Sequence, residues 1–365
     1  MKKIGNLREI FLTKERINEA IDHLTSKAKR NKWTFATSRE WKRLLKKRNK
    51  VVDEIYTKLI TRTYKFKNFK IFNRNESKKV RHIYASHVED QIVDYILDEC
   101  LKYVFMEKKK IIHPNCYGSI KGRGQHELRK KIMNLIKGKD NIYVAMCDTK
   151  QYYPTINQDI LLKAINRHIK DPWVLWLSEL TIRRMPGGKG LALGLATSNI
   201  LGHVYHAEVD WIITQEYGFK NYFRFCDDKI LVSHDKNLLH TMVRIIRGLV
   251  EEKQDQVLKF SWKVVRVEKQ RIELLGSLIN SKNAIITSYK RRKLERKFKK
   301  EMSKPFVLER DCDRILRTWG GIRGSLKDLD VRNLLRWWVY ESPFKLFFYR
   351  LRLCMLYIEN GRRNI

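Results

Sequence analysis

Two adjacent aspartates, Asp227 and Asp228, interrupt an apolar stretch that runs from Phe223 to Val232. Apolar residues on both sides of a short polar step predict two strands joined by a tight turn, with both carboxylates exposed at its tip. Taken alone, such a pair is more often an ordinary Asx-type turn than a binding site. Two neighbouring carboxylates also attract a hard divalent cation such as Mg²⁺, so the rest of the chain must decide between these interpretations.

A third carboxylate follows a second apolar run. Residues 141–148 are predicted to form a buried strand that ends at Asp148, and a helix is expected over 159–169. Binding sites are commonly built at the carboxyl ends of strands. Between this strand and the paired aspartates, a loop around Gly194 leads into an amphipathic helix that is expected to reach Asp210. The chain thus presents a strand acid, a glycine loop with a helix, and an acidic hairpin, in that order.

This order of motifs resembles that of reverse transcriptases, and specifically the bacterial retroelement type related to group II intron, retron, diversity-generating and defence-associated enzymes. The segment Phe225-Cys226-Asp227-Asp228 stands where the family has Tyr-x-Asp-Asp, and Asp148 stands at its first metal-binding aspartate. The resemblance covers about residues 60–340. It implies an α+β fold of the right-hand polymerase kind, with fingers, a palm made of an antiparallel sheet backed by helices, and a helical thumb.

The resemblance also suggests how the chain is divided. The expected parts are an N-terminal helical basic extension over 1–60, fingers over 61–140, a palm over 141–285 with part of the fingers inserted at about 165–190, and a helical thumb over 286–365. Within them, hydrophobic periodicity predicts strands over 70–74, 79–84 and 258–265, and helices over 88–105 and 238–252. In the N-terminal part, Trp33 and Trp41 lie among lysines and arginines, so RNA contact and a solvated helix face are about equally supported.

Site residues follow from the same motifs. The resemblance implies catalysis and metal binding at Asp148, Asp227 and Asp228, with the backbone carbonyl of Thr149 as a further ligand and two Mg²⁺ ions as the cofactor, for which Mn²⁺ is a substitute. The expected nucleotide-binding residues are Arg74, Arg81, Tyr153, Gly194 and Ser198; the expected primer grip is Leu275 and Gly276; the expected nucleic-acid-binding residues are Lys121, Arg123, Arg291 and Arg292.

Individual reasons support some of these assignments. Arg74 and Arg81 lie on a predicted hairpin from which cations can clamp a triphosphate, although an edge hairpin protected by charge is the alternative. Lys121 and Arg123 lie in a glycine-bearing segment that suits the close approach of a nucleic-acid backbone. Tyr153 follows Asp148 by five positions, where the resemblance implies a ring that excludes the ribose 2′-hydroxyl and so selects deoxynucleotides.

The chain departs from the family pattern at several positions. The family usually has Gln before the motif glycine and Pro after the serine, whereas Leu193 precedes Gly194 and Asn199 follows Ser198 here. Diversity-generating enzymes typically carry Ser-Gln, which Asn199 does not match, so this position favours a role in anti-phage defence over diversification. Phe225 replaces the usual Tyr but keeps the ring, and we expect little effect on catalysis.

Composition indicates the partners. Lysine and arginine number 77 against 40 acidic residues, a net charge of +37, and nucleic acid is the natural partner for such an excess. We therefore expect a dedicated noncoding RNA as template, a DNA or RNA primer, dNTPs, and an accessory protein or a second copy of the chain, with no membrane. The six cysteines form no CxxC pair and no apolar signal region follows Met1, which favours reduced thiols and a cytoplasmic location.

Two other functions stay open. A non-catalytic, maturase-like RNA-binding protein could keep the fold and the charge, but the three intact aspartates speak against it. An RNA-dependent RNA polymerase shares the palm, yet Tyr153 and the lack of Gly-Asp-Asp disfavour it. His203 and His206 are three positions apart, but only Glu208 or Asp210 lies near enough in sequence to complete a metal site, so no zinc is assigned.

Overall fold

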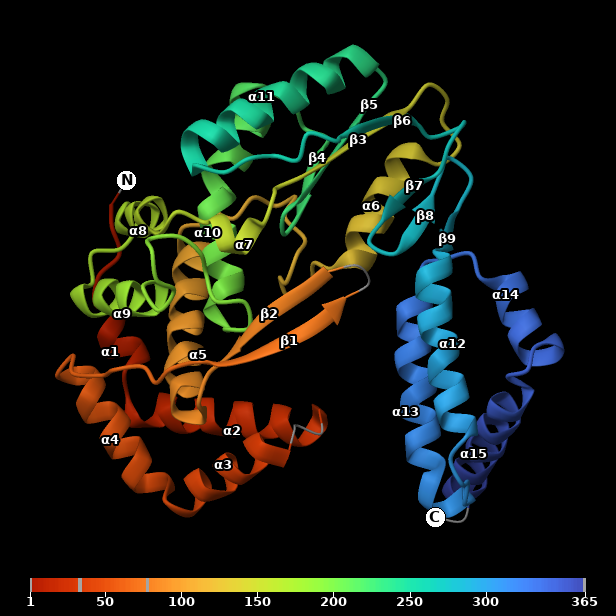
Figure 1. The fold of residues 1–365 in the computed structure, drawn as a ribbon, viewed down its shortest axis with the longest axis horizontal. Coiled ribbons are helices and arrows are strands. Elements are labelled where there is room, and N and C mark those ends of the chain that lie inside the picture. The colour runs from red at the N-terminus through yellow and green to blue at the C-terminus, as the bar shows by residue number, and fades with distance from the viewer. Residues whose placement is uncertain (1, 32–34, 77–78, 364–365) are drawn as a thin grey trace. The chain divides into compact units, whose positions relative to one another are not determined.

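A computed structural model describes residues 2–31, 35–76 and 79–363. The chain forms two compact units, each built from three segments. Unit 1 comprises Met1–Ser119, Cys147–Lys229 and Thr241–Trp262, and unit 2 comprises Ile120–Met146, Ile230–His240 and Lys263–Ile365. Helices and antiparallel strands occur together (Figure 1), so the α+β class is confirmed. The four-part division proposed from the sequence stays a prediction.

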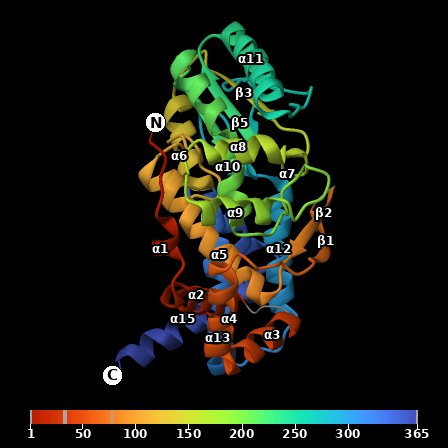
Figure 2. The ribbon, with the colours of Figure 1, turned by 90° about the vertical axis from the view of Figure 1, so that its left-hand side faces the viewer.

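Unit 1 is mainly helical and is organised around α5. This helix buries Ile92, Val93, Ile96 and Leu97 along one side, as the predicted stripe requires. The helices α2, α9 and α10 pack against it, and Figure 2 shows α9 and α10 beside it. The helical elements here are α1 (Leu7–Phe11), α2 (Lys14–Asn31), α3 (Phe35–Lys46), α4 (Arg48–Ile60), α5 (Val88–Lys102), η1 (Tyr103–Lys108), α7 (Tyr152–Thr155), α8 (Gln158–Asn166), α9 (Pro172–Ile182), α10 (Thr197–Trp211) and η2 (Ile212–Glu216).

The N-terminal segment is helical, as predicted, and is anchored by one buried carboxylate. Asp171 caps α9 by accepting hydrogen bonds from the backbone N–H groups of Trp173 and Val174. Its second oxygen accepts a 2.7 Å bond from the N–H of Leu7 at the start of α1. Trp41 is only 4% exposed, so its ring belongs to the core and cannot stack on RNA, while Trp33 lies outside the described residues.

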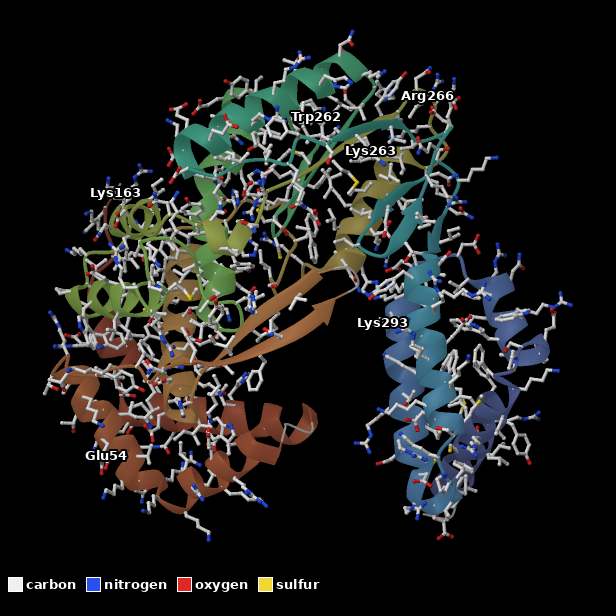
Figure 3. All side chains as sticks on the ribbon, in the orientation of Figure 1. Glu54, Lys163, Trp262, Lys263, Arg266 and Lys293 are labelled. Atoms are coloured by element: carbon white, nitrogen blue, oxygen red, sulfur yellow. The ribbon has the colours of Figure 1, made fainter. Side chains whose placement is uncertain are left out.

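The central sheet carries the acidic hairpin. Its order is β4-β5-β3-β6, with β3 (Tyr143–Asp148), β4 (Tyr222–Phe225), β5 (Asp228–Ser233) and β6 (Lys263–Arg266). The predicted strand over 258–265 is wrong in its first half. Residues 257–259 pair instead with the end of β3, through Lys259 N–H to the Asp148 carbonyl and Lys150 N–H to the Val257 carbonyl. Residues 260–262 lie outside any strand, and β6 starts after Trp262, at Lys263 (Figure 3).

The other strands form two smaller sheets. The hairpin β1 (Lys70–Glu76) and β2 (Lys79–Ala85) is antiparallel and pairs Arg74 with Arg81, which confirms the predicted strands. A three-stranded sheet of β7 (Ile272–Leu274), β8 (Ser277–Ile279) and β9 (Ala284–Ile286) was not expected. Its strands of three residues are too short for a period-two pattern to be visible in the sequence.

Unit 2 contains the C-terminal helical bundle, whose helices lie between Ser288 and Arg363. Phe298, Trp338 and Phe347 are fully buried at its centre. The elements are α6 (Gln125–Ile136), α12 (Ser288–Met302), α13 (Leu308–Leu326), α14 (Arg332–Arg336), η3 (Trp337–Glu341) and α15 (Lys345–Arg363), while α11 (Lys236–Gln254) begins in unit 2 and ends in unit 1. Within the described ranges, no helix has the length and apolar character that crossing a membrane requires.

Candidate active site

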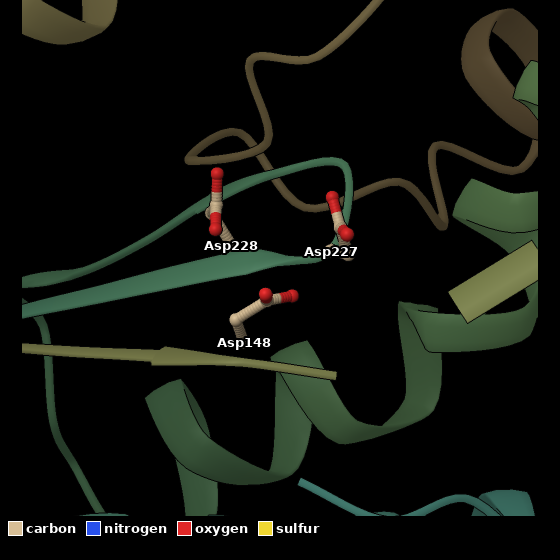
Figure 4. A group of neighbouring side chains, drawn as sticks. All are labelled: Asp148, Asp227 and Asp228. Atoms are coloured by element: carbon tan, nitrogen blue, oxygen red, sulfur yellow. The ribbon is translucent and has the colours of Figure 1, made fainter. Parts of the chain in front are cut away.

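Three carboxylates come together in unit 1. Asp148 ends β3, Asp227 lies in the turn between β4 and β5, and Asp228 begins β5. One oxygen of each lies within 4.8 Å of the others, and Figure 4 shows Asp148 facing the other two across the hairpin. The prediction that Asp227 and Asp228 are exposed at the tip is wrong, because both are half-buried. A close cluster of carboxylate oxygens of this kind could hold a divalent cation.

The residues fit a divalent metal ion. The Oδ1 atom of Asp148 is buried and has no hydrogen-bond partner among the described residues, so it is an unused oxygen ligand. Burial and the neighbouring charge of Asp227 raise the pKa of Asp228 to about 6. The unpartnered oxygen of Asp148 and the raised pKa of Asp228 have the same cause, which is an excess of negative charge at a poorly hydrated site. A hard cation bound there would neutralise that charge. The other oxygen of Asp148 forms an ion pair with the ammonium of Lys259.

The hairpin turn is fitted closely against a second loop. Cys226 has a left-handed backbone with φ of 53°, which sends the chain into Asp227. A Cβ on Gly118 would lie 2.4 Å from the Cys226 Sγ and 2.6 Å from its backbone nitrogen. Position 118 therefore requires glycine, because any side chain would push the turn and its aspartate away.

A buried ion pair supports the turn from below. The guanidinium of Arg224 bonds to Asp210 at 2.7 Å, with both side chains fully buried, and it donates to the Cys226 carbonyl at 2.9 Å. Tyr222 donates a further 2.8 Å bond to Asp210. Burial alone would raise the pKa of Asp210, but the charge and hydrogen bonds of Arg224 outweigh it and hold that pKa below its usual range. This network fixes β4 and the turn to α10.

A lysine lies beneath the carboxylates. Lys229 is fully buried, and its ammonium donates to the Thr149 hydroxyl at 2.9 Å and to the Asp227 carbonyl at 3.3 Å. Burial lowers its pKa below the ordinary value. It therefore links the two segments that carry Asp148 and Asp227, and brings a positive charge close to the acid cluster.

The tyrosine assigned as a steric gate is held by α10. Tyr153 donates a 3.2 Å hydrogen bond to the Asn199 Oδ1 atom and its ring contacts that of Tyr152. Tyr152 in turn donates a 2.7 Å bond to the Gly202 carbonyl and stacks on His206. His206 is fully buried, and His203 lies 2.6 Å from the Gly118 carbonyl, so both histidines serve packing around the site.

Two other expected nucleotide-binding residues shape the glycine loop. Gly194 has φ of 126°, and a Cβ there would lie 2.8 Å from the Tyr84 carbonyl. Leu193 accepts a 2.9 Å bond from the Tyr84 N–H, so the loop runs along β2. Ser198 is buried and its hydroxyl donates to the Ala192 carbonyl at 2.7 Å, so it shapes the loop, and its role in nucleotide binding stays a prediction. The side chains of Arg74 and Arg81 lie outside the described part.

The remaining expected residues belong to unit 2 and are not part of the acid cluster. Leu275 and Gly276 form the left-handed turn between β7 and β8, with φ of 49° and 74°. Arg291 pairs with Glu295 at 2.8 Å and lies over the Trp337 ring, so it packs within the bundle. Of the other three, Lys121 and Arg292 are exposed and Arg123 is half-buried.

Sequence reasoning missed Lys229 and Lys259. Lys229 had a signal, because a lysine at the start of the apolar run Ile230-Leu231-Val232 is inconsistent with a fully apolar strand. Lys259 had none, because its contact with Asp148 depends on backbone pairing between segments more than 100 residues apart. The Arg224–Asp210 pair likewise joins two elements that only the fold brings together.

An antiparallel sheet with a three-carboxylate site at the end of one strand and at the hairpin beside it defines a nucleic-acid polymerase of the right-hand kind. The chain belongs to the reverse transcriptase (RNA-dependent DNA polymerase) family, whose model matches residues 71–279. No curated protein matches the chain.

Telomerases are among the solved structures that the chain resembles. One is telomerase from Candida albicans in complex with a TWJ fragment of telomeric RNA, at 12% identity and a TM-score of 0.46, covering 63% of this chain and 48% of that one. Two are apo telomerases from Candida tropicalis with TM-scores of 0.47, at 15% identity with 64% and 59% covered, and at 13% identity with 66% and 54% covered. The chain thus spans between about half and three fifths of these structures.

Proposed function

We propose that this protein is a reverse transcriptase that copies a dedicated noncoding RNA into cDNA. The observation that carries the proposal is the cluster of Asp148, Asp227 and Asp228, whose oxygens lie within 4.8 Å of one another in a chain that belongs to the reverse transcriptase family. A protein that only bound RNA would not need three carboxylates so close together, since their mutual repulsion is costly without a cation.

The three aspartates would hold two Mg²⁺ ions, or Mn²⁺ in their place, which supply Lewis-acid activation of the primer hydroxyl and neutralise the triphosphate. The protein's own residues bind and orient. Arg74 and Arg81, paired in register on β1 and β2, clamp the triphosphate of the incoming dNTP. Tyr153 lies under its sugar, and the turn at Leu275 and Gly276 supports the primer. The primer 3′ hydroxyl loses its proton to solvent, its oxygen bonds to the α-phosphorus, and the bond from that phosphorus to pyrophosphate breaks.

The biological setting is a bacterial retroelement-type enzyme in an anti-phage defence system, acting in the cytoplasm. Asn199, which follows Ser198 where diversity-generating enzymes carry Gln, supports defence over diversification. The net charge of +37 supports a stable complex with the noncoding RNA. The alternatives are the reverse transcriptase of a diversity-generating retroelement and a non-catalytic, maturase-like RNA-binding protein.

The test uses the full chain purified with the RNA that it carries from its own genetic locus. With Mg²⁺ and labelled dNTPs, the wild type is expected to make a cDNA that matches one copurified RNA. A variant with Asp227→Asn and Asp228→Asn should lose this product by more than about a thousandfold while it retains the RNA. Tight RNA binding with no product from the wild type under any primer condition would favour the maturase-like alternative. A template-region repeat in a neighbouring variable gene would favour diversification.

A further inference from the structure

A buried arginine in unit 2 has no carboxylate partner. Arg129, on α6, is 1% exposed, and its Nε atom has no hydrogen-bond partner among the described residues. Its other nitrogens meet only neutral groups: the Ser277 hydroxyl at 3.3 Å, the Lys327 carbonyl at 2.9 Å and the His126 ring at 2.8 Å. Burial lowers the pKa of Arg129, and the charge of Asp328, which makes no direct ion pair with it, offsets this only in part. A buried guanidinium that is only partly compensated is costly, so the position suits an anion that binds there.

A second buried cation lies behind Arg129. The ammonium of Lys290, on α12, is buried and has no hydrogen-bond partner in the described part of the chain. Burial and then the charge of Arg129 lower the pKa of Lys290, which places the two cations close enough to repel each other. The Lys290 side chain also packs under Gly276, with its Cδ 3.2 Å from where a Cβ would stand. The interior here is therefore positive.

Arg129 lines a cavity of about 640 Å³ that opens between α6, the turn before β9 and the loop that follows α13. We call it the basic cavity. Its wall carries five cations and two acids among Arg129, Lys130, Met133, Asn134, Lys137, Lys282, Asn283, Ala284, Asp328, Leu329, Asp330 and Arg332. Asp328 lies 3.5 Å from the His126 ring, and Asp330 accepts a 2.8 Å bond from Asn283. Asp330 also lies 3.8 Å from the Nε atom of Arg332, a long and solvent-exposed ion pair that contributes little and that a phosphate can replace.

We propose that the basic cavity binds backbone phosphates of the RNA, with Arg129 as its buried anchor and Lys130, Lys282 and Arg332 as its exposed rim. Arginine suits this role because its fork of donors matches phosphate oxygens. The cavity is much larger than a single phosphate, and its rim cations come from three separate segments, so the geometry fits a run of phosphodiesters better than one small anion. The site uses no residue of the acid cluster. The choice of RNA rests on the proposed function.

The test changes the rim and leaves the buried anchor in place, because replacing Arg129 itself could prevent folding. The rim variant carries Lys130→Gln, Lys282→Gln and Arg332→Gln, all exposed positions. The matched control carries Lys297→Gln, Lys299→Gln and Lys300→Gln, three exposed cations on α12 outside the cavity. Both lose the same net charge. The probe is a fluorescein-labelled RNA hairpin of about 30 nucleotides, titrated at several salt concentrations.

The rim variant is expected to bind this RNA at least tenfold more weakly at moderate salt. The slope of log K against log salt should fall by about 2 to 3, close to one for each phosphate contact removed. For the control variant, this slope should fall by less than half as much as it does for the rim variant. Equal slopes for the rim and control variants would overturn the proposal. Millimolar inorganic phosphate, added to all three proteins, gives a second check. If the wild type, the rim variant and the control then bound the RNA with equal affinity, the cavity would take a small anion and the proposal would be overturned.

Primer extension separates this inference from the proposed function. The rim variant should raise the KM for the RNA template while kcat stays within about twofold, since none of its positions contacts the acid cluster. A fall in kcat at saturating RNA would contradict a separate binding site. If the wild type made no cDNA while the rim variant still lost RNA affinity and salt slope, the proposed function would fail and the basic cavity would stand.

Discussion

The hydroxyl of Tyr153 donates a hydrogen bond to Asn199 over 3.2 Å. Asn199 is one of the positions at which the chain departs from the sequence pattern of its family, and Tyr153 is the residue assigned to sugar selection. The bond joins the helix start after Asp148 to the first turn of α10. A residue that differs from the family pattern therefore bears directly on how firmly the tyrosine ring is held.

Removing this bond should weaken discrimination between dNTPs and rNTPs. Asn199→Ala and Tyr153→Phe each delete it, and a lost hydrogen bond of about 1 kcal/mol corresponds to about a fivefold loss of discrimination. Single-nucleotide incorporation with each kind of substrate measures the ratio of kcat/KM values. The double variant should show no further loss, because both changes remove one interaction. Additive effects in the double variant would mean that the two residues act separately.

Replacing the buried lysine should make the fold depend on metal. Lys229→Met removes the cation that links Thr149 to Asp227, so the carboxylates repel each other with less compensation. Without Mg²⁺ we expect a loss of about 1–3 kcal/mol in the free energy of unfolding, and added Mg²⁺ should recover most of it. Thermal unfolding with and without Mg²⁺ measures this. Lys163→Met, at an exposed site on α8 (Figure 3), is the control, and a Mg²⁺-induced shift equal to that of the wild type would contradict the role of Lys229.

The glycine loop should not tolerate a side chain at its central position. Gly194→Ala places a Cβ 2.8 Å from the Tyr84 carbonyl at a left-handed φ of 126°, and we expect a loss of about 1–3 kcal/mol in unfolding free energy. Gly124→Ala is the matched control, because that glycine has extended backbone and open space around it. Urea unfolding compares the two. Equal stabilities would show that the loop moves away from β2 at little cost.

Stability should fall as pH rises through the titration of one core carboxylate. Burial raises the pKa of Asp98 to about 7 from its ordinary 3.8, although Lys102 lies 2.6 Å away. Because the folded state then holds this proton more tightly than the unfolded state, the protein loses stability between about pH 4 and pH 7.

Asp98→Asn cannot titrate, so it isolates this effect. It should match the wild type near pH 4.5 and exceed it near pH 8 by on the order of 2–4 kcal/mol. Urea unfolding at both pH values provides the measurement. A wild type that gains stability relative to the variant as pH rises would show that the ion pair with Lys102 outweighs burial.

Local pattern predicted the elements whose signals are long or strongly punctuated. The apolar run before Asp148, the acidic hairpin and the stripe of α5 were all found as expected, because each carries its own periodicity. The strand expected over 258–265 was wrong in its first half, because residues 257–259 pair with the end of β3. The three short strands β7, β8 and β9 carry too few residues for any pattern to show.

The candidate site was predictable only in its acids. Asp148, Asp227 and Asp228 are marked by the strands that precede or follow them. The residues that support these acids carry no such mark in the sequence. Arg224, Asp210 and Lys259 meet their partners only through contacts between distant segments. A lysine or arginine in a chain with 77 of them carries no individual signal until the fold shows which are buried.

The position of β3, the strand that carries Asp148, affects how the chain folds while it is being synthesised. In the sheet, β3 lies between β5 and β6, and β6 begins 115 residues after β3 ends. At roughly 5–20 residues per second, synthesis takes about 6 to 23 s to make that interval. During this time β3 has an unpaired edge that invites aggregation. The edge of β3 that β6 covers is thus protected late, after all three aspartates have been synthesised, and a nascent chain stalled before Lys263 would leave most of that edge exposed.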